Sequence, residues 1–407
     1  MKKFIAIAAA ALALAGVCSS IGWAQDNPIK IGAMTPNTGG IAILGNDLAR
    51  WYELAAEEVN AKGGVLGRKV QIIRGDATNA QEAIAAVDKL VTINKVDIIT
   101  GTIASFISQA ASEASLNYGK MYWETNSLAV DLTERGLPNF LRTGPSAAYY
   151  ALQAADVTKN KLAKEIGKKV GDLKVWVEHE DSNYGTSIAT EVNRLMTVDG
   201  AKVQIAGHKA SSVDLTDAVL RAKEYNPDVF IISGYVVDTN LLLRTMRERQ
   251  FKPAATILIG LGDSKETADA VGLDYLQGIL VVSFPRHHIS QKYAPGSDEV
   301  NEKFKKKYGA EPVGNAGFNG YVGMQILFKA IEATKGDMSP TALMQAAKAM
   351  DFPMGTFTSG YGVKFDEKMQ NTRGEAVTYQ WQGDVTTVVW PDAAKLATTE
   401  LKKLARP

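Results

Sequence analysis

Short apolar runs alternate with amphipathic segments along the first part of the chain. Residues 29–34 form an apolar run, which predicts a buried strand. The next segment predicts an amphipathic helix that ends at Gly63-Gly64, since glycine adopts the left-handed conformation of a helix exit without strain. Its apolar residues recur at i, i+3 and i+4 spacing: Leu48, Trp51, Ala55 and Val59. Further strands are predicted over 70–73, 96–100 and 120–124.

The same alternation restarts in the middle of the chain. Strands are predicted over 174–178, 202–206, 228–233 and 256–260, and helices over 186–196, 215–225 and 241–250. Because β and α elements alternate, each unit is expected to form a parallel sheet covered by helices on both faces. The fold class is therefore α/β, with two doubly wound domains whose ligand-capable loops lie at the carboxyl ends of the strands. Residues 392–404 predict a charged surface helix.

Residues 1–24 have the layout of a secretory signal peptide. A basic start precedes an Ala-rich apolar run over 4–17, and Gly22-Trp23-Ala24 supplies the small residues of a cleavage site. A membrane anchor is the alternative, but the run is shorter than the ~20 residues that a spanning helix needs. A lipid-bearing Cys18 is disfavoured, because Val17 stands where lipoprotein signals have Gly, Ala or Ser. We therefore predict export of the mature chain to a bacterial-type periplasm.

Composition excludes several classes of protein. The length of 407 residues fits two or three domains, and 46% hydrophobic with 22% charged residues is ordinary for a globular chain. Lys and Arg total 45 against 44 for Asp and Glu, so nothing in the charge favours nucleic acid as a partner. A single cysteine excludes an intramolecular disulfide, a Cys-rich zinc site and an iron–sulfur cluster.

Motifs of catalysis and of cofactor binding are missing from the sequence. There is no G-x-S-x-G nucleophile elbow and no phosphate-binding P-loop. Gly260-Leu261-Gly262 lacks the third glycine of a dinucleotide fingerprint, since Lys265 stands in its place. The histidines do not show metal-ligand spacing: His179, His208, His287 and His288. We therefore expect a protein that is not an enzyme and that uses no cofactor and no metal.

A few residues at predicted strand ends are suited to hold a ligand. Ser105 lies where a strand gives way to a helix, so free N–H groups and its hydroxyl are available to a carboxylate. Capping of its own helix is the alternative role. Tyr184 and Tyr235 each follow a strand of the second unit and offer a flat apolar face with a hydroxyl. Glu124 ends another strand, and either accepts from a ligand or binds the loop that follows.

Several segments together resemble one family. The string Asn60–Val70 (NAKGGVLGRKV) is similar to a signature of the type I periplasmic solute-binding proteins, in the branched-chain (leucine/isoleucine/valine-type) amino-acid-binding family of ABC importers. Residues 31–36, 38–39, 132–136, 141–143 and 183–185 fit the same pattern. The combined string is specific, whereas each piece alone is weak. The resemblance covers about residues 29–390.

The resemblance implies two lobes joined by a hinge of three chain crossings, near Thr143, Val282 and Gly360. Lobe 1 is then 27–143 with 283–359, and lobe 2 is 144–282 with 360–390, followed by a tail over 391–407. The ligand is expected to bind between the lobes and to close them. The implied partners are a small carboxylate-bearing ligand and an inner-membrane ABC permease, and the protein is expected to be a monomer.

The resemblance also implies a set of ligand contacts, which we carry over residue by residue. Two positions depart from the family pattern, because Leu128 replaces a hydroxyl residue and Gly262 stands where an acidic residue pairs with the ligand's ammonium group. Either Asp263 or Glu124 then supplies that charge, or the ligand has no ammonium group. The expected ligand-binding residues are Leu44, Ile103, Ser105, Glu124, Ser127, Tyr184, Tyr235, Asp263 and Phe318.

The expected function is capture of a small carboxylate-bearing solute for an ABC importer, with a branched-chain or hydrophobic amino acid as the first choice. The same fold also accommodates an amide, a urea-like compound or an aromatic carboxylate. A sensor that presents its closed state to a signalling receptor is a further alternative. A secreted enzyme has the least support, since no nucleophile or metal motif is found.

Overall fold

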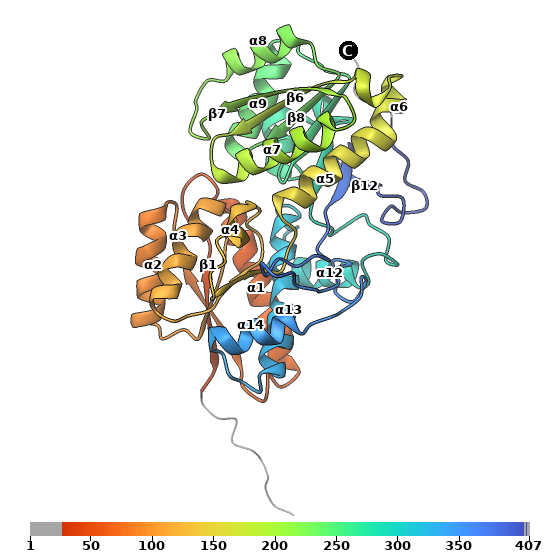
Figure 1. The fold of residues 1–407 in the computed structure, drawn as a ribbon. Helices are drawn as coiled ribbons and strands as arrows, with labels where there is room; N and C mark the ends of the chain where they lie inside the picture. Colours follow the sequence, from red (N-terminus) through yellow and green to blue (C-terminus); the bar gives the residue numbers. More distant parts are fainter. Residues whose placement is uncertain (1–26, 403, 405–407) are drawn as a thin grey trace, which may run out of the picture.

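The first lobe is built on a five-stranded sheet in a computed structural model that describes residues 27–402 and 404. Its strands are β1 (Ile29–Met34), β2 (Val70–Gly75), β3 (Ile98–Gly101), β4 (Tyr122–Glu124) and β5 (Phe140–Arg142). They are parallel throughout, in the order β2-β1-β3-β4-β5. The helices of this lobe surround the sheet (Figure 1): α1 (Ala42–Ala61), α2 (Ala80–Thr92), α3 (Ser105–Asn117), α4 (Asp131–Glu134), α12 (Ser297–Tyr308), α13 (Ala316–Ala333) and α14 (Pro340–Lys348).

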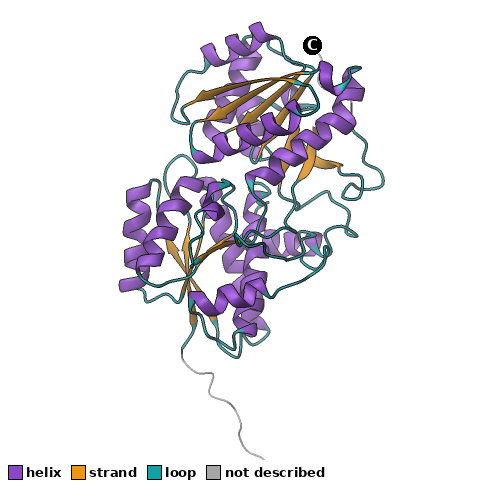
Figure 2. Ribbon diagram, viewed as in Figure 1, coloured by secondary structure: helices purple, strands orange, loops and turns teal. Residues whose placement is uncertain are grey.

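The second lobe is built on a seven-stranded sheet in the order β12-β11-β10-β9-β8-β6-β7. Five strands are parallel: β6 (Lys174–Glu180), β7 (Lys202–His208), β8 (Val229–Ser233), β9 (Ala255–Ile259) and β10 (Leu280–Ser283). An antiparallel hairpin, β11 (Val377–Gln382) and β12 (Val385–Trp390), completes one edge. Helices cover both faces of this sheet as well (Figure 2): α5 (Ala147–Val157), α6 (Ala163–Ile166), α7 (Asn183–Thr197), α8 (Thr216–Tyr225), α9 (Val236–Glu248), α10 (Lys265–Val271) and α11 (Leu273–Leu276), with a π-helical turn at Thr158–Leu162 and a 3₁₀ turn at Val170–Asp172.

This architecture confirms the predicted fold class of two doubly wound parallel-sheet lobes. In each lobe the second strand pairs on one side of the first and the third strand pairs on its other side, so the chain reverses direction across the sheet. The reversal falls between β1 and β3 in the first lobe and between β6 and β8 in the second. Such switch points form a crevice at the carboxyl ends of the strands, where ligands bind in open α/β sheets.

Three segments connect the lobes: 143–146, 284–296 and 349–376. The third connection lies beside β5, where Arg142 N donates to Met369 O at 3.0 Å and Asn371 N donates to Arg142 O at 2.9 Å. Gly374 lies against Gly144 and Pro145, so the first and third connections are in contact. The lobe limits given above stay predictions, and the expected signal peptide (residues 1–24) lies outside the described residues.

The expected helix over 392–404 is wrong. The described residues of this segment, 391–402 and 404, form turns and extended chain without a helix. Their backbone groups bind the second lobe and the connecting segment 284–296 instead. Lys402 N donates to Gln380 Oε1 at 2.8 Å, and Ser290 N donates to Ala394 O at 2.8 Å. Charge patterning alone does not reveal such contacts.

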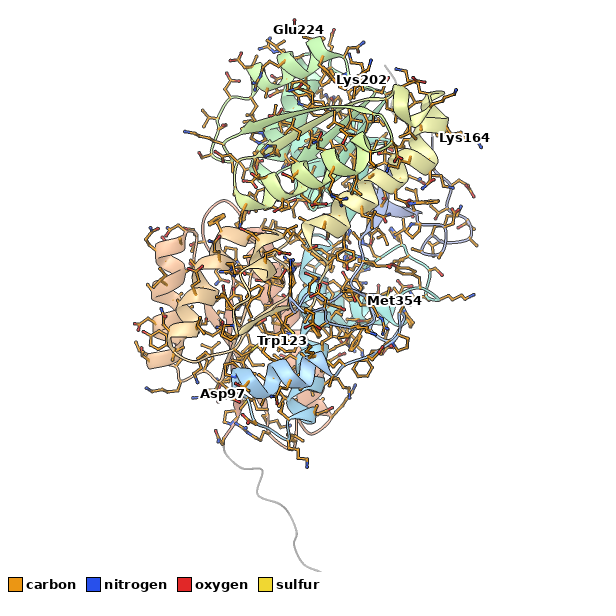
Figure 3. The ribbon with its side chains drawn as sticks, viewed as in Figure 1. Asp97, Trp123, Lys164, Lys202, Glu224 and Met354 are labelled. Atoms are coloured by element: carbon orange, nitrogen blue, oxygen red, sulfur yellow. The ribbon has the colours of Figure 1, made fainter. Side chains whose placement is uncertain are left out.

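The core of the first lobe is centred on Trp51 of α1, which is fully buried. Its ring stacks on Phe304 at 4.2 Å between centroids and meets Phe318 edge-on at 5.2 Å. Glycines of α13 permit this close approach, because a Cβ at Gly317 would lie 2.4 Å from Trp51 Cδ1. Trp123 of β4 also lies inside this lobe, whereas Lys164, Lys202 and Glu224 lie on the outer surface of the other (Figure 3).

We expect Trp51→Ala to lower the free energy of unfolding by about 4 kcal/mol, because it leaves a cavity between two packed helices. Urea unfolding followed by far-UV circular dichroism measures this change. The control is Val198→Ala, since Val198 is 78% exposed and its truncation should change stability by less than about 0.5 kcal/mol. A loss below about 1 kcal/mol for Trp51→Ala would contradict this account of the core.

Candidate ligand-binding cleft

The loops at the two switch points face each other across the gap between the lobes. In the first lobe, residues 102–104 lead from β3 into α3. In the second, Tyr184 opens α7 after β6, and Tyr235 precedes α9 after β8. The rings of Phe106 and Tyr235 meet across the gap at 6.5 Å between centroids. The carboxyl ends of both sheets therefore look onto one cleft.

A small cavity lies between these loops and is lined by both lobes. Its volume is about 30 Å³, which is space for about one water molecule. No charged side chain stands among its described lining residues, which are Ile103, Asn126, Leu128, Tyr184, Tyr235, Gly260, Leu261, Phe284 and Ala316. Residues of both lobes therefore lie close together around this small cavity.

Few polar contacts hold the lobes together at the mouth of the cleft. Val130 N donates to Ser187 Oγ at 3.2 Å. Asn183 Nδ2 donates to both carboxylate oxygens of Asp131, each at 3.2 Å. All four residues are partly exposed, so water replaces these contacts at little cost when the hinge opens.

Helix α3 has no side-chain cap and begins two residues after Ile103, which lines the cavity. Its N-cap residue is Ala104, whose methyl group accepts no hydrogen bond, whereas Ser182 caps α7 by accepting from Tyr184 N. Ser105 itself is fully buried and is not among the residues that line the cavity. It is not the cap residue of α3, so the alternative role considered for it is wrong. Its Oγ accepts from Ala129 N at 3.1 Å, and its hydroxyl proton remains to be donated. The end of α3 therefore offers N–H groups and a positive dipole end to an anion.

Glu124 is fully buried and organises the loop that follows β4. Its Oε1 accepts from the backbone N–H groups of Thr125, Asn126 and Ser127 at 2.8–3.0 Å and from Thr102 N at 3.2 Å. Its Oε2 accepts from the Ser108 hydroxyl. Burial raises the pKa of Glu124, and these donors oppose that rise. Of the two roles expected for Glu124, the structure shows the bond to its own loop, so its prediction as a ligand contact is corrected.

Ser127, like Glu124, forms hydrogen bonds within the protein that hold this loop in place. Its hydroxyl donates to Thr102 O at 3.0 Å, which ties the β4 loop to the β3 loop. Its carbonyl accepts from Nη1 of the buried Arg142 at 3.0 Å. Ser127 therefore shapes the cavity from behind and does not line it.

Tyr184 and Tyr235 form the wall that the second lobe contributes. Their ring centroids are 5.6 Å apart, and both side chains are buried. The Tyr184 hydroxyl donates to Ile259 O at 2.6 Å. The Tyr235 hydroxyl has no hydrogen-bond partner among the described residues. A buried hydroxyl without a partner is costly, so the Tyr235 hydroxyl retains an unmet hydrogen bond.

Three other predicted residues do not reach the cavity. Phe318 packs in the core against Trp51, and Leu44 is buried in the hydrophobic core that surrounds α2 and α3. Asp263 Oδ2 accepts from Ser283 Oγ at 3.0 Å and from Asn315 N at 3.1 Å. The structure corrects these three assignments, because each side chain is committed to packing or to hydrogen bonds elsewhere.

Sequence reasoning missed Phe284, Leu261, Asn126 and Ala316 as lining residues. Phe284 directly follows β10, and Leu261 follows β9 at a distance of two residues. The tyrosines were predicted because they follow the ends of strands, and the same reasoning applies to Phe284 and Leu261. Ala316 gives no such signal, because it comes from the start of α13 in the other lobe.

A larger open groove of about 680 Å³ lies beside the cleft. Charged residues line it, including Asp263, Arg286, Lys305 and Glu311, together with His287. We propose the smaller cavity for the ligand, because it lies between the loops of both switch points.

A buried ionic network supports the Tyr235 loop. His208 Nε2 lies 3.1 Å from Asp238 Oδ2, and its Nδ1 lies 3.1 Å from Glu178 Oε1. Asp238 Oδ1 accepts from Tyr235 N at 2.9 Å, which fixes the start of α9. Burial lowers the pKa of His208, but hydrogen bonds to Asp238 and Glu178 outweigh it and raise the pKa to about 9.

The described residues contain no group of three or more His, Cys, Asp and Glu side chains placed to hold a metal ion. Within the same part of the chain, every helix is too short or too polar to cross a membrane.

Two α/β lobes that close on a cavity at the carboxyl ends of their sheets define a hinged, two-lobe ligand-binding protein. Residues 28–384 match the family described as periplasmic binding protein. The chain belongs to this family, which confirms the resemblance seen in the sequence. Family members are solute-binding proteins of transporters and not enzymes.

Relatives of known sequence and structure agree with this assignment. The Leu/Ile/Val-binding protein homolog 7 of Brucella suis is 36% identical over 402 residues, which cover 98% of this chain and 99% of that protein. A leucine-binding protein of Thermotoga maritima is 23% identical with a TM-score of 0.76, over 88% of this chain and 97% of its own. An ABC-transporter solute-binding protein of R. palustris, solved with benzoate, is 18% identical with a TM-score of 0.76, over 93% and 100% of the two chains. The two solved structures share the fold.

We expect His208→Gln to lower the free energy of unfolding by about 3 kcal/mol at pH 6, because it breaks a buried ion network. The raised pKa makes this contribution full below the unfolded value of 6.5, and it is lost as the pH rises through about 9. Urea unfolding at pH 6 and pH 9.5 should therefore show a smaller deficit at the higher pH. The control is His179→Gln on the same strand as Glu178. A deficit that stays constant with pH would contradict a charged His208.

Proposed function

We propose that this protein captures a small carboxylate-bearing solute between its two lobes and delivers it to an ABC importer. The observation that carries this proposal is the uncapped amino terminus of α3, two residues after the cavity-lining Ile103, with the Ser105 hydroxyl beside it. An anion there receives backbone N–H groups and the positive end of the helix dipole. The unpartnered Tyr235 hydroxyl provides a second donor from the opposite lobe.

The relatives support the carboxylate as the shared feature of the ligands. Their names and complexes refer to leucine, isoleucine and valine in some cases and to benzoate in another. These compounds share a carboxylate and an apolar group but differ in the ammonium group. Members of the family are periplasmic, which fits the proposed signal peptide over residues 1–24.

In the proposed cycle, the closed position of the lobes indicates that a solute is bound. The solute binds the first lobe through its carboxylate while the lobes are apart, and closure then brings Tyr184 and Tyr235 over its apolar part. A permease that docks on both lobes distinguishes the closed form from the open one. The lobes reopen when the solute is released to the permease.

We expect Ser105→Ala to weaken carboxylate binding by about tenfold to 100-fold, the cost of one hydrogen bond to a charged group. Calorimetric titration with leucine and with benzoate measures the change for whichever of the two binds. The matched control is Ser115→Ala on the same helix, because the Ser115 hydroxyl donates to Ala111 O at 2.6 Å, away from the cavity. Equal affinities of Ser105→Ala and the unaltered protein would place the carboxylate elsewhere.

A further inference from the structure

We propose that the cleft selects a carboxylate that carries no ammonium group, in the class of aliphatic or aromatic monocarboxylates. This inference rests on the proposed function, because it takes the carboxylate at α3 as given. An ammonium group in the cavity would need an anion or free hydrogen-bond acceptors. The acidic side chains, the carbonyl groups and the cation near the cavity decide whether these are present.

Four acidic residues that neighbour the lining residues in the sequence are each already bound by donors of the protein. Glu124 accepts from four backbone N–H groups and a serine hydroxyl, as described above. Glu180 ends β6 and accepts from Ser182 N, Ser182 Oγ and Gly185 N, each at 2.7 Å. Its side chain is fully buried. Neither glutamate is directed at the cavity.

The other two acidic residues are committed in the same way. Asp238 is fully buried and binds Tyr235 N and His208. Asp263 binds Ser283 Oγ and Asn315 N, and it lines the open groove beside the cleft. An ammonium group in the cavity would therefore lose its water without gaining an anionic partner, which is strongly unfavourable.

Backbone carbonyls around the cavity are occupied as well. The carbonyls of Ser127 and Ala129 accept from Arg142 Nη1 at 3.0 and 2.7 Å. Leu128 O accepts from Ala147 N at 2.6 Å, and Ile259 O accepts from the Tyr184 hydroxyl. Leu128 itself presents an apolar side chain to the cavity. These four carbonyl groups are therefore less available to an N–H donor of a ligand.

A buried positive charge stands behind the same loop. Arg142 is fully buried, and no carboxylate of the described residues lies within ion-pair distance of its guanidinium. Its guanidinium donates hydrogen bonds to Gln370 Oε1 and to the two loop carbonyls. Burial lowers the pKa of Arg142, and the carboxylates of Glu124, Asp131 and Asp366 lie near enough to raise it against that effect, so they offset part of its field. The case against an ammonium group therefore rests on the hydrogen bonds that already occupy the acidic side chains.

Two acidic residues remain near the lining residues in the sequence, Asp131 and the exposed Asp181. Asp131 is partly exposed and accepts from Asn183 of the opposite lobe. An ammonium group that reached Asp131 would gain an anionic partner, which the four acidic residues described above do not provide. Asp131→Asn tests this route, because it removes the charge and keeps the shape of the side chain.

The test compares pairs of ligands that differ only in the ammonium group. Leucine is paired with 4-methylpentanoate, and phenylalanine with 3-phenylpropanoate, in calorimetric titrations of the full mature protein freed of bound solute. We expect at least one amine-free acid to bind about 100-fold more tightly than its amino acid. Equal or tighter binding of the amino acid would overturn this inference and leave the proposed function standing. If none of the four binds, and benzoate does not bind either, the proposed function fails with it.

A gain of binding provides the second measurement. Leu128→Asp places a carboxylate in the cavity and should raise the affinity for the amino acid of a pair at least tenfold relative to Leu128→Asn, which has the same size without the charge. Thermal unfolding confirms that both variants are folded. If both are folded and show the same preference, the missing anion is not what excludes the ammonium group. If Asp131→Asn weakens amino-acid binding in the unaltered background, Asp131 is the partner, and the inference is wrong.

Discussion

The buried guanidinium of Arg142 joins the hinge of this protein to its ligand-binding loop. Arg142 ends β5, immediately before the first connection between the lobes. Its Nε donates to Gln370 Oε1 at 2.6 Å on the third connection, and its Nη1 holds two carbonyls of the loop that carries Leu128. A charge without these acceptors would be costly to bury. The third crossing segment and the cavity loop are therefore fixed relative to each other.

The two lobes use the same device to hold their cleft loops. Glu124 at the end of β4 and Glu180 at the end of β6 are both fully buried, and both accept from the backbone N–H groups of the turn that follows. Three or more donors on one carboxylate make a rigid turn, because leaving any of them unpaired is unfavourable. The same arrangement removes these carboxylates from recognition. Rigidity of the cleft and the absence of a free anion in it are consequences of one set of hydrogen bonds.

Local patterns predicted the scaffold well and the site only partly. The alternation of apolar runs located strands such as β7 and β8 within a few residues, since period and burial are properties of short segments. The ends of the predicted strands identified Tyr184 and Tyr235 for the same reason. Glu124 shows the limit of this approach, because its position at a strand end fits a ligand contact as well as a loop anchor. Phe318 was carried over from a resemblance, and its packing against Trp51 depends on a contact between α1 and α13, which are far apart in the sequence.

In the proposed function, closure by both lobes calls for a ligand with two chemically different ends. The carboxylate site that we propose at α3 belongs to the first lobe, whereas the tyrosine wall belongs to the second. A small carboxylate such as acetate would bind at α3 but would make few contacts with the tyrosines. An apolar compound without a charge would not bind at α3 in the open form. Only a molecule with both ends stabilises the closed form from both sides, because a ligand shifts a conformational equilibrium by its difference in affinity for the two states. The cavity of about 30 Å³ adds a constraint of size, since every atom of the ligand must be accommodated by the angle at which the lobes come to rest. In the proposed cycle, the angle of closure then depends on ligand size, and a permease in contact with both lobes would distinguish one angle from another.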